Sequence, residues 1–313
     1  LGLFLAVEMA MGLALGGCGG RRGGGTVDQD GQDTAQPDGG ESPNSDVPDG
    51  APDAPDGGPG YTEPVCTLVD LGDVSSTYTP AGWYASLLTI LDRGYPYGSD
   101  ILRQVNDPAQ IDTFVTQADW MGFSFSISTA VHEGAHIWDY NGATATAHPY
   151  FVRSDLTITI RLFTTFARSE ILPYHANSAA DMYDDVYLTG FAGTQGFDSL
   201  LDEYNAYTHS LATDYCVRDL YAPYSISARD GILTFMYYVE LYLMVARLNH
   251  PTVYAALTAE PQTVRLILTD WDRAEFYLGL SAGIRALGLN DATIRTWTYD
   301  PVLLEEIARL RAL

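Results

Sequence analysis

The chain has 313 residues, which is more than one ordinary domain needs and fewer than two large domains hold. Its formal net charge is −24, and all 16 of its basic residues are arginine. A protein that binds nucleic acid needs a basic face, so we expect no nucleic-acid partner. A strongly acidic protein stays soluble and repels anionic surfaces.

The first segment, residues 1–18, is apolar and ends in small residues, which is typical of a secretory signal peptide. Its last four residues, Leu15, Gly16, Gly17 and Cys18, resemble the lipobox of bacterial lipoproteins. The resemblance implies that Cys18 is acylated on sulfur and becomes the new N-terminus. It also implies an exported protein that its lipid holds in the cell envelope, at the outer membrane or cell surface rather than the inner membrane. A plain cleaved signal with an incidental cysteine is the alternative.

The next segment, residues 19–62, is dense in Gly, Asp and Pro and has almost no large apolar side chains. Such a segment cannot bury enough apolar surface to offset the entropy lost on ordering. We therefore expect a disordered, acidic, extended tether. From residue 63 the composition becomes globular, so residues 63–313 are expected to form the folded domain.

Two further cysteines, Cys66 and Cys216, form an even pair if Cys18 carries lipid. An exported protein lies in an oxidising compartment, so we expect a Cys66–Cys216 disulfide. It would join the start of the folded domain to its middle. Two buried thiols are the alternative.

The folded part is expected to be mainly α, with a small sheet that makes it α+β. Alternation of apolar and polar residues from Leu156 to Leu162 predicts a strand. One predicted helix is apolar nearly all round and almost long enough to cross a bilayer, but Glu240 at its centre and Arg247 near its end favour a core helix. Helix-spaced apolar residues predict helices over residues 81–95, 125–140, 197–216, 231–248, 274–289 and 301–313.

The second of these helices contains the sequence HEGAH, an H-E-x-x-H motif. On a helix, His132 and His136 are one turn apart and face the same way, so both imidazoles reach one metal ion. Glu133 projects beside them and is well placed to hold a metal-bound water. The motif therefore predicts a zinc site, in which small Gly134 and Ala135 leave room near the metal. The alternative is a pair of satisfied core histidines with a surface glutamate.

A tetrahedral zinc site needs a third protein ligand. The metzincin continuation of the motif is excluded, because Asp139 and Gly142 stand where its glycine and last histidine belong. What remains is a glutamate from a later helix. We favour Glu203, within LLDEYNAYTHSL, over the rivals Glu240 and Glu170 or a spare histidine.

The run E-Y-N-A-Y-T-H-S that begins at Glu203 is similar to the ligand helix of gluzincins, which are H-E-x-x-H zinc metallopeptidases. The resemblance implies a zincin-like domain that hydrolyses peptide bonds in protein or peptide substrates. It implies Zn²⁺ held by His132, His136 and Glu203, with Glu133 as the general base.

This run departs from the thermolysin-like pattern, in which an acid that would orient a histidine stands where this sequence has Tyr207. Asp202, Asp139 or an acid of the DMYDD run is expected to orient the histidine instead; the acids of that run are Asp181, Asp184 and Asp185.

A donor for the oxyanion is also expected, with Tyr207, Tyr187 and His209 as candidates. Two other classes of function stay open. One is a non-catalytic surface lipoprotein, a binding or scaffold protein with a structural or vestigial zinc site. The other is a structural lipoprotein without metal.

Overall fold

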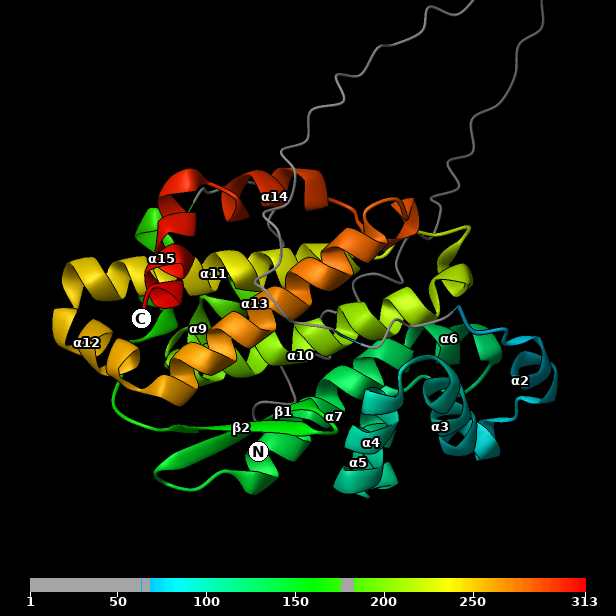
Figure 1. The fold of residues 1–313 in the computed structure, drawn as a ribbon. Coiled ribbons are helices and arrows are strands. Elements are labelled where there is room, and N and C mark those ends of the chain that lie inside the picture. Colours follow the sequence, from blue (N-terminus) through cyan, green and yellow to red (C-terminus); the bar gives the residue numbers. More distant parts are fainter. Residues whose placement is uncertain (1–62, 64–67, 176–182) are drawn as a thin grey trace, which may run out of the picture. The chain divides into compact units, whose positions relative to one another are not determined.

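The computed structural model describes residues 63, 68–175 and 183–313, and they form a mainly helical fold with one small sheet (Figure 1). The predicted lipobox with Cys18, the predicted tether 19–62 and Cys66 lie outside the described residues. The helices before the sheet are α2 (Gly72–Thr77), α3 (Trp83–Gly94), α4 (Pro96–Val105), α5 (Pro108–Ile111), α6 (Trp120–Phe125) and α7 (Ile127–Gly142).

After the sheet, two short helices precede the long helices of the core. The helices of this part are α8 (Asp184–Tyr187), α9 (Gly190–Gly193), α10 (Phe197–Cys216), α11 (Ala228–Asn249), α12 (Pro251–Ala259), α13 (Pro261–Ser281), α14 (Asp291–Thr298) and α15 (Pro301–Arg311).

The sheet is an antiparallel hairpin of β1 (Ala147–Arg153) and β2 (Leu156–Arg161), which packs against α7, α10 and α13. The strand predicted from Leu156 is confirmed as β2, and its burial alternates as expected. Ile158 and Ile160 are buried, and Thr157, Thr159 and Arg161 are exposed. We did not predict β1. Its sequence does not alternate, since Tyr150, Phe151 and Val152 are all buried, and Pro149 argues against a strand.

The long helices α10 and α11 form the centre of the fold, and α10 packs against α7, α11 and α13. Among the described helices, α11 has the length and apolarity to cross a membrane, but most of its apolar stretch is buried inside the fold. The expectation of a core helix therefore agrees with its position. A helix that is covered on all sides has no need of a polar face.

The helix predicted over residues 274–289 is wrong in its bounds. In the structure α13 begins at Pro261, where the side chain of Glu260 accepts a hydrogen bond from the N–H of Thr263 at 2.5 Å. Proline is favoured in the first turn of a helix because its missing N–H is not needed there. The helix ends at Ser281, and a 3₁₀ turn at Arg285–Leu287 follows.

Candidate metal centre

The centre of the candidate site is the pair of histidines on α7. The rings of His132 and His136 lie with their centroids 4.7 Å apart in an edge-to-face arrangement, and their Nε2 atoms are 3.1 Å apart. The α-helical spacing of four residues produces this convergence, as the motif predicted.

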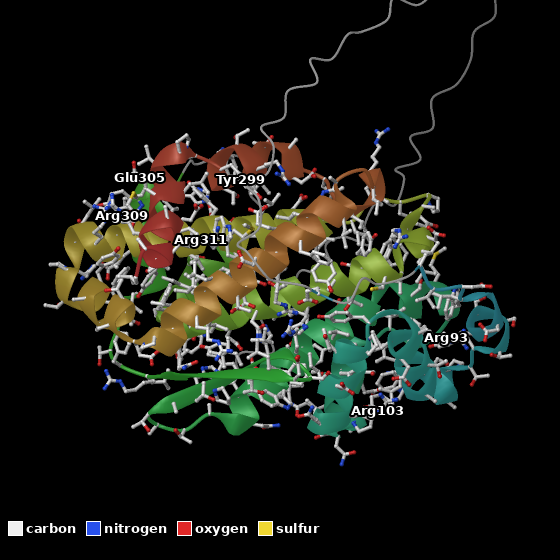
Figure 2. The ribbon with its side chains drawn as sticks, viewed as in Figure 1. Arg93, Arg103, Tyr299, Glu305, Arg309 and Arg311 are labelled. Carbon is white, nitrogen blue, oxygen red and sulfur yellow. The ribbon has the colours of Figure 1, made fainter. Side chains whose placement is uncertain are left out.

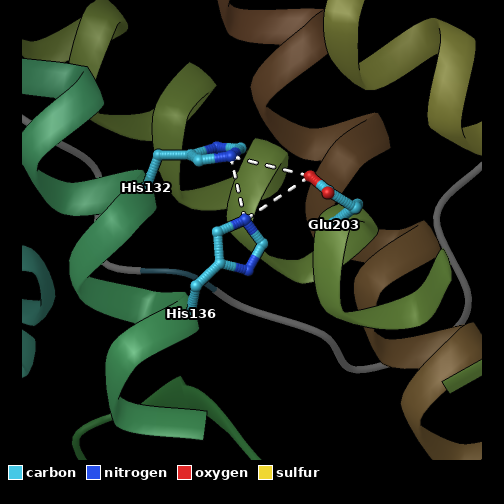
Figure 3. A group of neighbouring side chains, drawn as sticks. All are labelled: His132, His136 and Glu203. Atoms are coloured by element: carbon cyan, nitrogen blue, oxygen red, sulfur yellow. Dashed lines mark hydrogen bonds and ion pairs between the residues drawn. The ribbon is translucent and has the colours of Figure 1, made fainter. Parts of the chain in front are cut away.

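Glu203 on α10 completes a group of three ligand atoms (Figure 3). Its Oε2 atom lies 3.4 Å from Nε2 of His136 and 3.7 Å from Nε2 of His132. Zinc bonds of about 2.0–2.1 Å in tetrahedral geometry place neighbouring ligand atoms about 3.3 Å apart. The three observed separations are close to that value, so the three atoms form a face that fits a tetrahedral metal ion.

The second ring nitrogen of each histidine, Nδ1, forms a hydrogen bond with a side chain of α10. His136 Nδ1 lies 2.7 Å from Oδ2 of Asp202, and His132 Nδ1 lies 3.0 Å from Oγ of Ser210. The Ser210 hydroxyl donates to the carbonyl of Ala206, so it accepts from His132. Each Nδ1 is then a hydrogen-bond donor, which leaves each Nε2 as the atom that faces the common centre and can bind a metal ion.

The charges in the group also fit a cation. Glu203 is 4% exposed, and its Oε2 accepts no hydrogen bond. Burial lowers the pKa of His136, but Asp202 and Glu203 outweigh that effect and hold its pKa well above the ordinary value. The buried carboxylates thus favour positive charge at this point, which a proton on His136 supplies in the metal-free group and a bound metal ion would supply in its place. Within the described residues, no other group of three or more His, Cys, Asp and Glu brings its ligand atoms this close.

The expected general base, Glu133, follows His132 on α7, and its side chain is buried. Gly134 does not make room at the metal side, contrary to our expectation. A Cβ atom on Gly134 would lie 2.7 Å from Cδ2 of Leu102 and 3.2 Å from Cγ2 of Ile101. The absence of a side chain at Gly134 therefore lets α4 approach the opposite face of α7.

The second expected feature is a hydrogen-bond donor for the oxyanion, for which Tyr207, Tyr187 and His209 were the candidates. The ring of Tyr207 lies edge-to-face on His132, with centroids 4.7 Å apart, and its hydroxyl is 2.8 Å from that of Tyr187. A Cβ atom on Gly231 would lie 2.4 Å from Cε1 of Tyr207, so glycine is required there for this ring to fit.

His209 does not point to the centre. Its Nε2 donates to the carbonyl of Phe151 at 2.7 Å, and its Nδ1 accepts from the hydroxyl of Tyr95 at 2.7 Å. Burial and the charge of Arg273 hold its pKa well below the ordinary value. His209 is therefore a neutral residue of the packed interior.

The rival ligands lie elsewhere. Glu170 accepts from His250 at 2.9 Å in an exposed pair. Glu240 is fully buried on α11, and neither it nor Glu170 belongs to the group of His132, His136 and Glu203.

Among the acids expected to orient a histidine, Asp202 takes that place, as described above. Asp139 instead accepts the N–H of Phe151 at 2.8 Å, and Asp184 accepts the hydroxyl of Tyr238 at 2.7 Å. Asp181 lies outside the described residues. We did not single out Ser210, although it stands seven residues after Glu203, which places both on one face of a helix.

The third expected feature is the disulfide, and the structure describes only one of its two predicted cysteines. Cys216 is buried at the end of α10 and is disulfide-bonded. Its predicted partner, Cys66, lies outside the described residues, so the pairing stays a prediction.

Comparison with known proteins identifies no relative. No protein-family model, no curated protein and no solved structure matches this chain. The function must therefore be inferred from the site itself.

Proposed function

We propose that the folded domain is a zinc-dependent metallopeptidase of the gluzincin type, with a zincin-like active site. The observation that carries the proposal is the convergence of His132 Nε2, His136 Nε2 and Glu203 Oε2, each within 3.7 Å of the others. Two imidazoles and one carboxylate, with the fourth position open to water, are the ligand set of catalytic rather than closed structural zinc sites.

The residues of the chain have separate tasks in this proposal. His132, His136 and Glu203 hold the metal, and Asp202 and Ser210 orient the two imidazoles. Bound zinc would polarise the substrate carbonyl and lower the pKa of a water molecule.

Glu133 then accepts the proton of the attacking water and delivers it to the leaving amine nitrogen. Tyr207 is the proposed donor to the tetrahedral oxyanion, because its ring lies against His132. The hydroxyl of Tyr187, 2.8 Å away, orients that of Tyr207.

The setting of this activity is proposed from the sequence alone. The lipobox-like residues that end at Cys18 support an exported protein, attached to the bacterial envelope by lipid and acting on protein or peptide substrates. The acidic composition argues against a role in binding nucleic acid.

The second candidate is a non-catalytic surface lipoprotein with a structural zinc site. The burial of the centre favours it, since the side chains of His132, His136 and Glu203 are only 7%, 13% and 6% exposed. A closed site of this kind would bind metal without admitting a substrate.

The test is metal content and peptide hydrolysis of the full chain, purified without added zinc, beside three variants. His132→Ala should lose both metal and activity, and Glu133→Gln should keep metal and lose about 10²–10⁴-fold in rate. Glu305→Gln, on the surface of α15 where Glu305 pairs with Arg309, is the matched control and should change neither (Figure 2).

Three results separate the candidates. Metal in both the wild type and Glu133→Gln, with hydrolysis only in the wild type, supports the peptidase. Metal in both with hydrolysis in neither supports the non-catalytic site. No metal in the folded wild type rejects both.

A further inference from the structure

A buried ion pair connects the N-terminal end of the described fold to α13. Arg273 on α13 is 0% exposed, and its Nε donates to Oε1 of Glu63 at 2.6 Å. The hydroxyl of Tyr277 donates to the other carboxylate oxygen of Glu63 at 2.9 Å. A buried guanidinium is tolerated only where charge and hydrogen bonds compensate it, so Glu63 fixes where Arg273 lies.

The other guanidinium nitrogens of Arg273 reach towards α10. Its Nη1 lies 3.4 Å from Oδ1 of Asn205 and 3.4 Å from Oδ1 of Asp270, and its Nη2 donates to the hydroxyl of Tyr95 at 3.2 Å. Asn205 stands two residues after the proposed ligand Glu203. The ion pair is therefore connected to the helix that supplies the third ligand.

The network continues from Asn205 to the helix of the two histidines. The Asn205 amide donates to Oδ2 of Asp139 at 3.2 Å and to the carbonyl of Phe151 at 3.1 Å. Asp139 is fully buried on α7, three residues after His136, and its Oδ1 accepts the N–H of Phe151 at 2.8 Å. Hydrogen bonds thus join α7, β1 and α10 at one point.

A second branch reaches the same strand. The hydroxyl of Tyr95, which accepts from Arg273, donates to Nδ1 of His209, whose Nε2 donates to the carbonyl of Phe151. Both branches start at Arg273 and meet at the carbonyl of Phe151 on β1, a strand that packs against α7 and α10. The position of the guanidinium therefore bears on the spacing between α7 and α10.

We propose that Glu63 is a positioning residue of the metal centre, which acts through Arg273 and Asn205. It holds the guanidinium where it bonds Asn205, and Asn205 holds α7 against α10. A neutral side chain at Glu63 leaves Asp270 as the nearest counter-charge of Arg273, which draws the guanidinium away from Asn205. Metal ligands tolerate displacements of only about 0.5 Å, so this shift weakens binding. The inference rests on the metal site of the proposed function.

Burial raises the pKa of Asp270 to about 7, although Arg273 acts against this. Its carboxyl lies 3.4 Å from Nη1 of Arg273, so Asp270 is the acidic group left beside the guanidinium when residue 63 is neutral.

The experiment compares Glu63→Gln with Glu306→Gln in the full chain. Glu306 is a matched control because it is 1% exposed and pairs with Arg247 at 2.6 Å, but that pair joins α11 and α15 and does not reach Asp139 or Asn205. Each variant removes one buried carboxylate charge opposite an arginine.

Zinc affinity is measured by competition with a chelator, and the absorption spectrum of the Co²⁺ form reports ligand geometry. We expect about tenfold weaker zinc binding and an altered Co²⁺ spectrum in Glu63→Gln. This is the low end of the about 10–100-fold cost of losing a direct outer partner of a metal ligand, because Glu63 acts through Arg273 and Asn205. Glu306→Gln should bind both ions as the wild type does. Wild-type affinity and spectrum in Glu63→Gln would overturn the proposal, even if that variant is less stable.

A second variant covers the case in which Glu63→Gln does not fold. The double variant Glu63→Gln with Arg273→Met removes both charges of the ion pair. Asp270, which loses its contact with Arg273, can take up a proton, because burial raises its pKa. The double variant should fold and still bind zinc about tenfold more weakly, because the bond to Asn205 is gone. Unchanged affinity would again overturn the proposal.

Hydrogen exchange of the metal-free chains keeps this test separate from that of the proposed function. Residues 136–142 and 201–209 should exchange faster in Glu63→Gln than in Glu306→Gln, whether or not the wild type binds zinc. A wild type without zinc rejects the proposed function. Equal exchange in the two variants rejects the role of Glu63.

Discussion

Two buried glutamates on neighbouring helices, Glu203 on α10 and Glu240 on α11, have opposite surroundings. Glu203 lies within 3.7 Å of two imidazole nitrogens. Glu240 is 0% exposed, and neither of its carboxyl oxygens has a hydrogen-bond partner. Burial raises its pKa well above the ordinary value, and the carboxylates of Asp300 and Glu275 raise it further.

The difference shows that burial alone does not identify a metal ligand. Both glutamates lie in strongly buried helices, and from the sequence both were candidates. A charged carboxylate needs positive partners, which only Glu203 has. Glu240 has acidic neighbours instead, and they oppose the ionisation of its carboxyl group.

The largest expected effect is a loss of zinc affinity that distinguishes Glu203 from Glu240. Glu203→Ala should reduce zinc affinity by more than the roughly 100-fold that marks the loss of an outer partner, because it removes a ligand. Glu240→Ala should leave zinc affinity unchanged. Zinc per chain after dialysis against a weak chelator measures both, and a chain that loses zinc only in Glu240→Ala would reverse the assignment.

The next effect concerns the orientation of His136. Asp202→Asn keeps an oxygen that accepts from His136 but removes its charge, so we expect zinc affinity to fall about 10–100-fold. Asp198→Asn, one turn earlier on α10, is the control and should have no effect. Chelator competition at constant pH measures the zinc affinity of the two variants. Equal affinities would show that the charge of Asp202 does not affect zinc binding.

A smaller effect of opposite sign is expected at Glu240. Glu240→Met removes two buried oxygens without partners and should stabilise the metal-free fold by about 1–3 kcal/mol at pH 7. The pKa of this carboxyl is raised in the folded state, so its destabilising effect appears as pH rises above the unfolded value, near 4.5. The gain should therefore shrink as pH falls towards about 4, where both states are protonated.

Urea unfolding of wild type and Glu240→Met at the two pH values measures this difference. Glu240→Gln is the companion variant, since it keeps the shape and polarity but cannot ionise. It should match the wild type at low pH and exceed its stability at pH 7. A gain that does not depend on pH would show that Glu240 is charged in the folded protein.

The smallest effect is expected at the third glutamate considered, Glu170. Its pair with His250 is exposed, and exposed pairs contribute only about 0–1 kcal/mol. Glu170→Gln should leave zinc affinity unchanged and shift the free energy of unfolding by less than about 1 kcal/mol. Metal loss in this variant would show that Glu170, and not Glu203, is the third ligand.

Sequence patterns predicted the helices well where apolar residues alone mark them. The helix predicted over residues 197–216 is α10, with the same bounds, and the strand from Leu156 is β2. The bounds of α13 were missed because the helix begins with a capping glutamate and Pro261 rather than with its apolar stripe. β1 was missed because burial on both faces removes the alternation that marks a strand.

The sequence by itself determined that His132 and His136 meet, because four residues make about one turn of a helix whatever surrounds it. It favoured Glu203 over Glu240, which lies 37 residues later, but it could not establish which of the two glutamates meets the histidines. Packing of α10 against α7 decided that, and the same contact brought Asp202 and Ser210 to the histidines. Local spacing follows from backbone geometry, whereas a contact between distant segments depends on how the whole core packs.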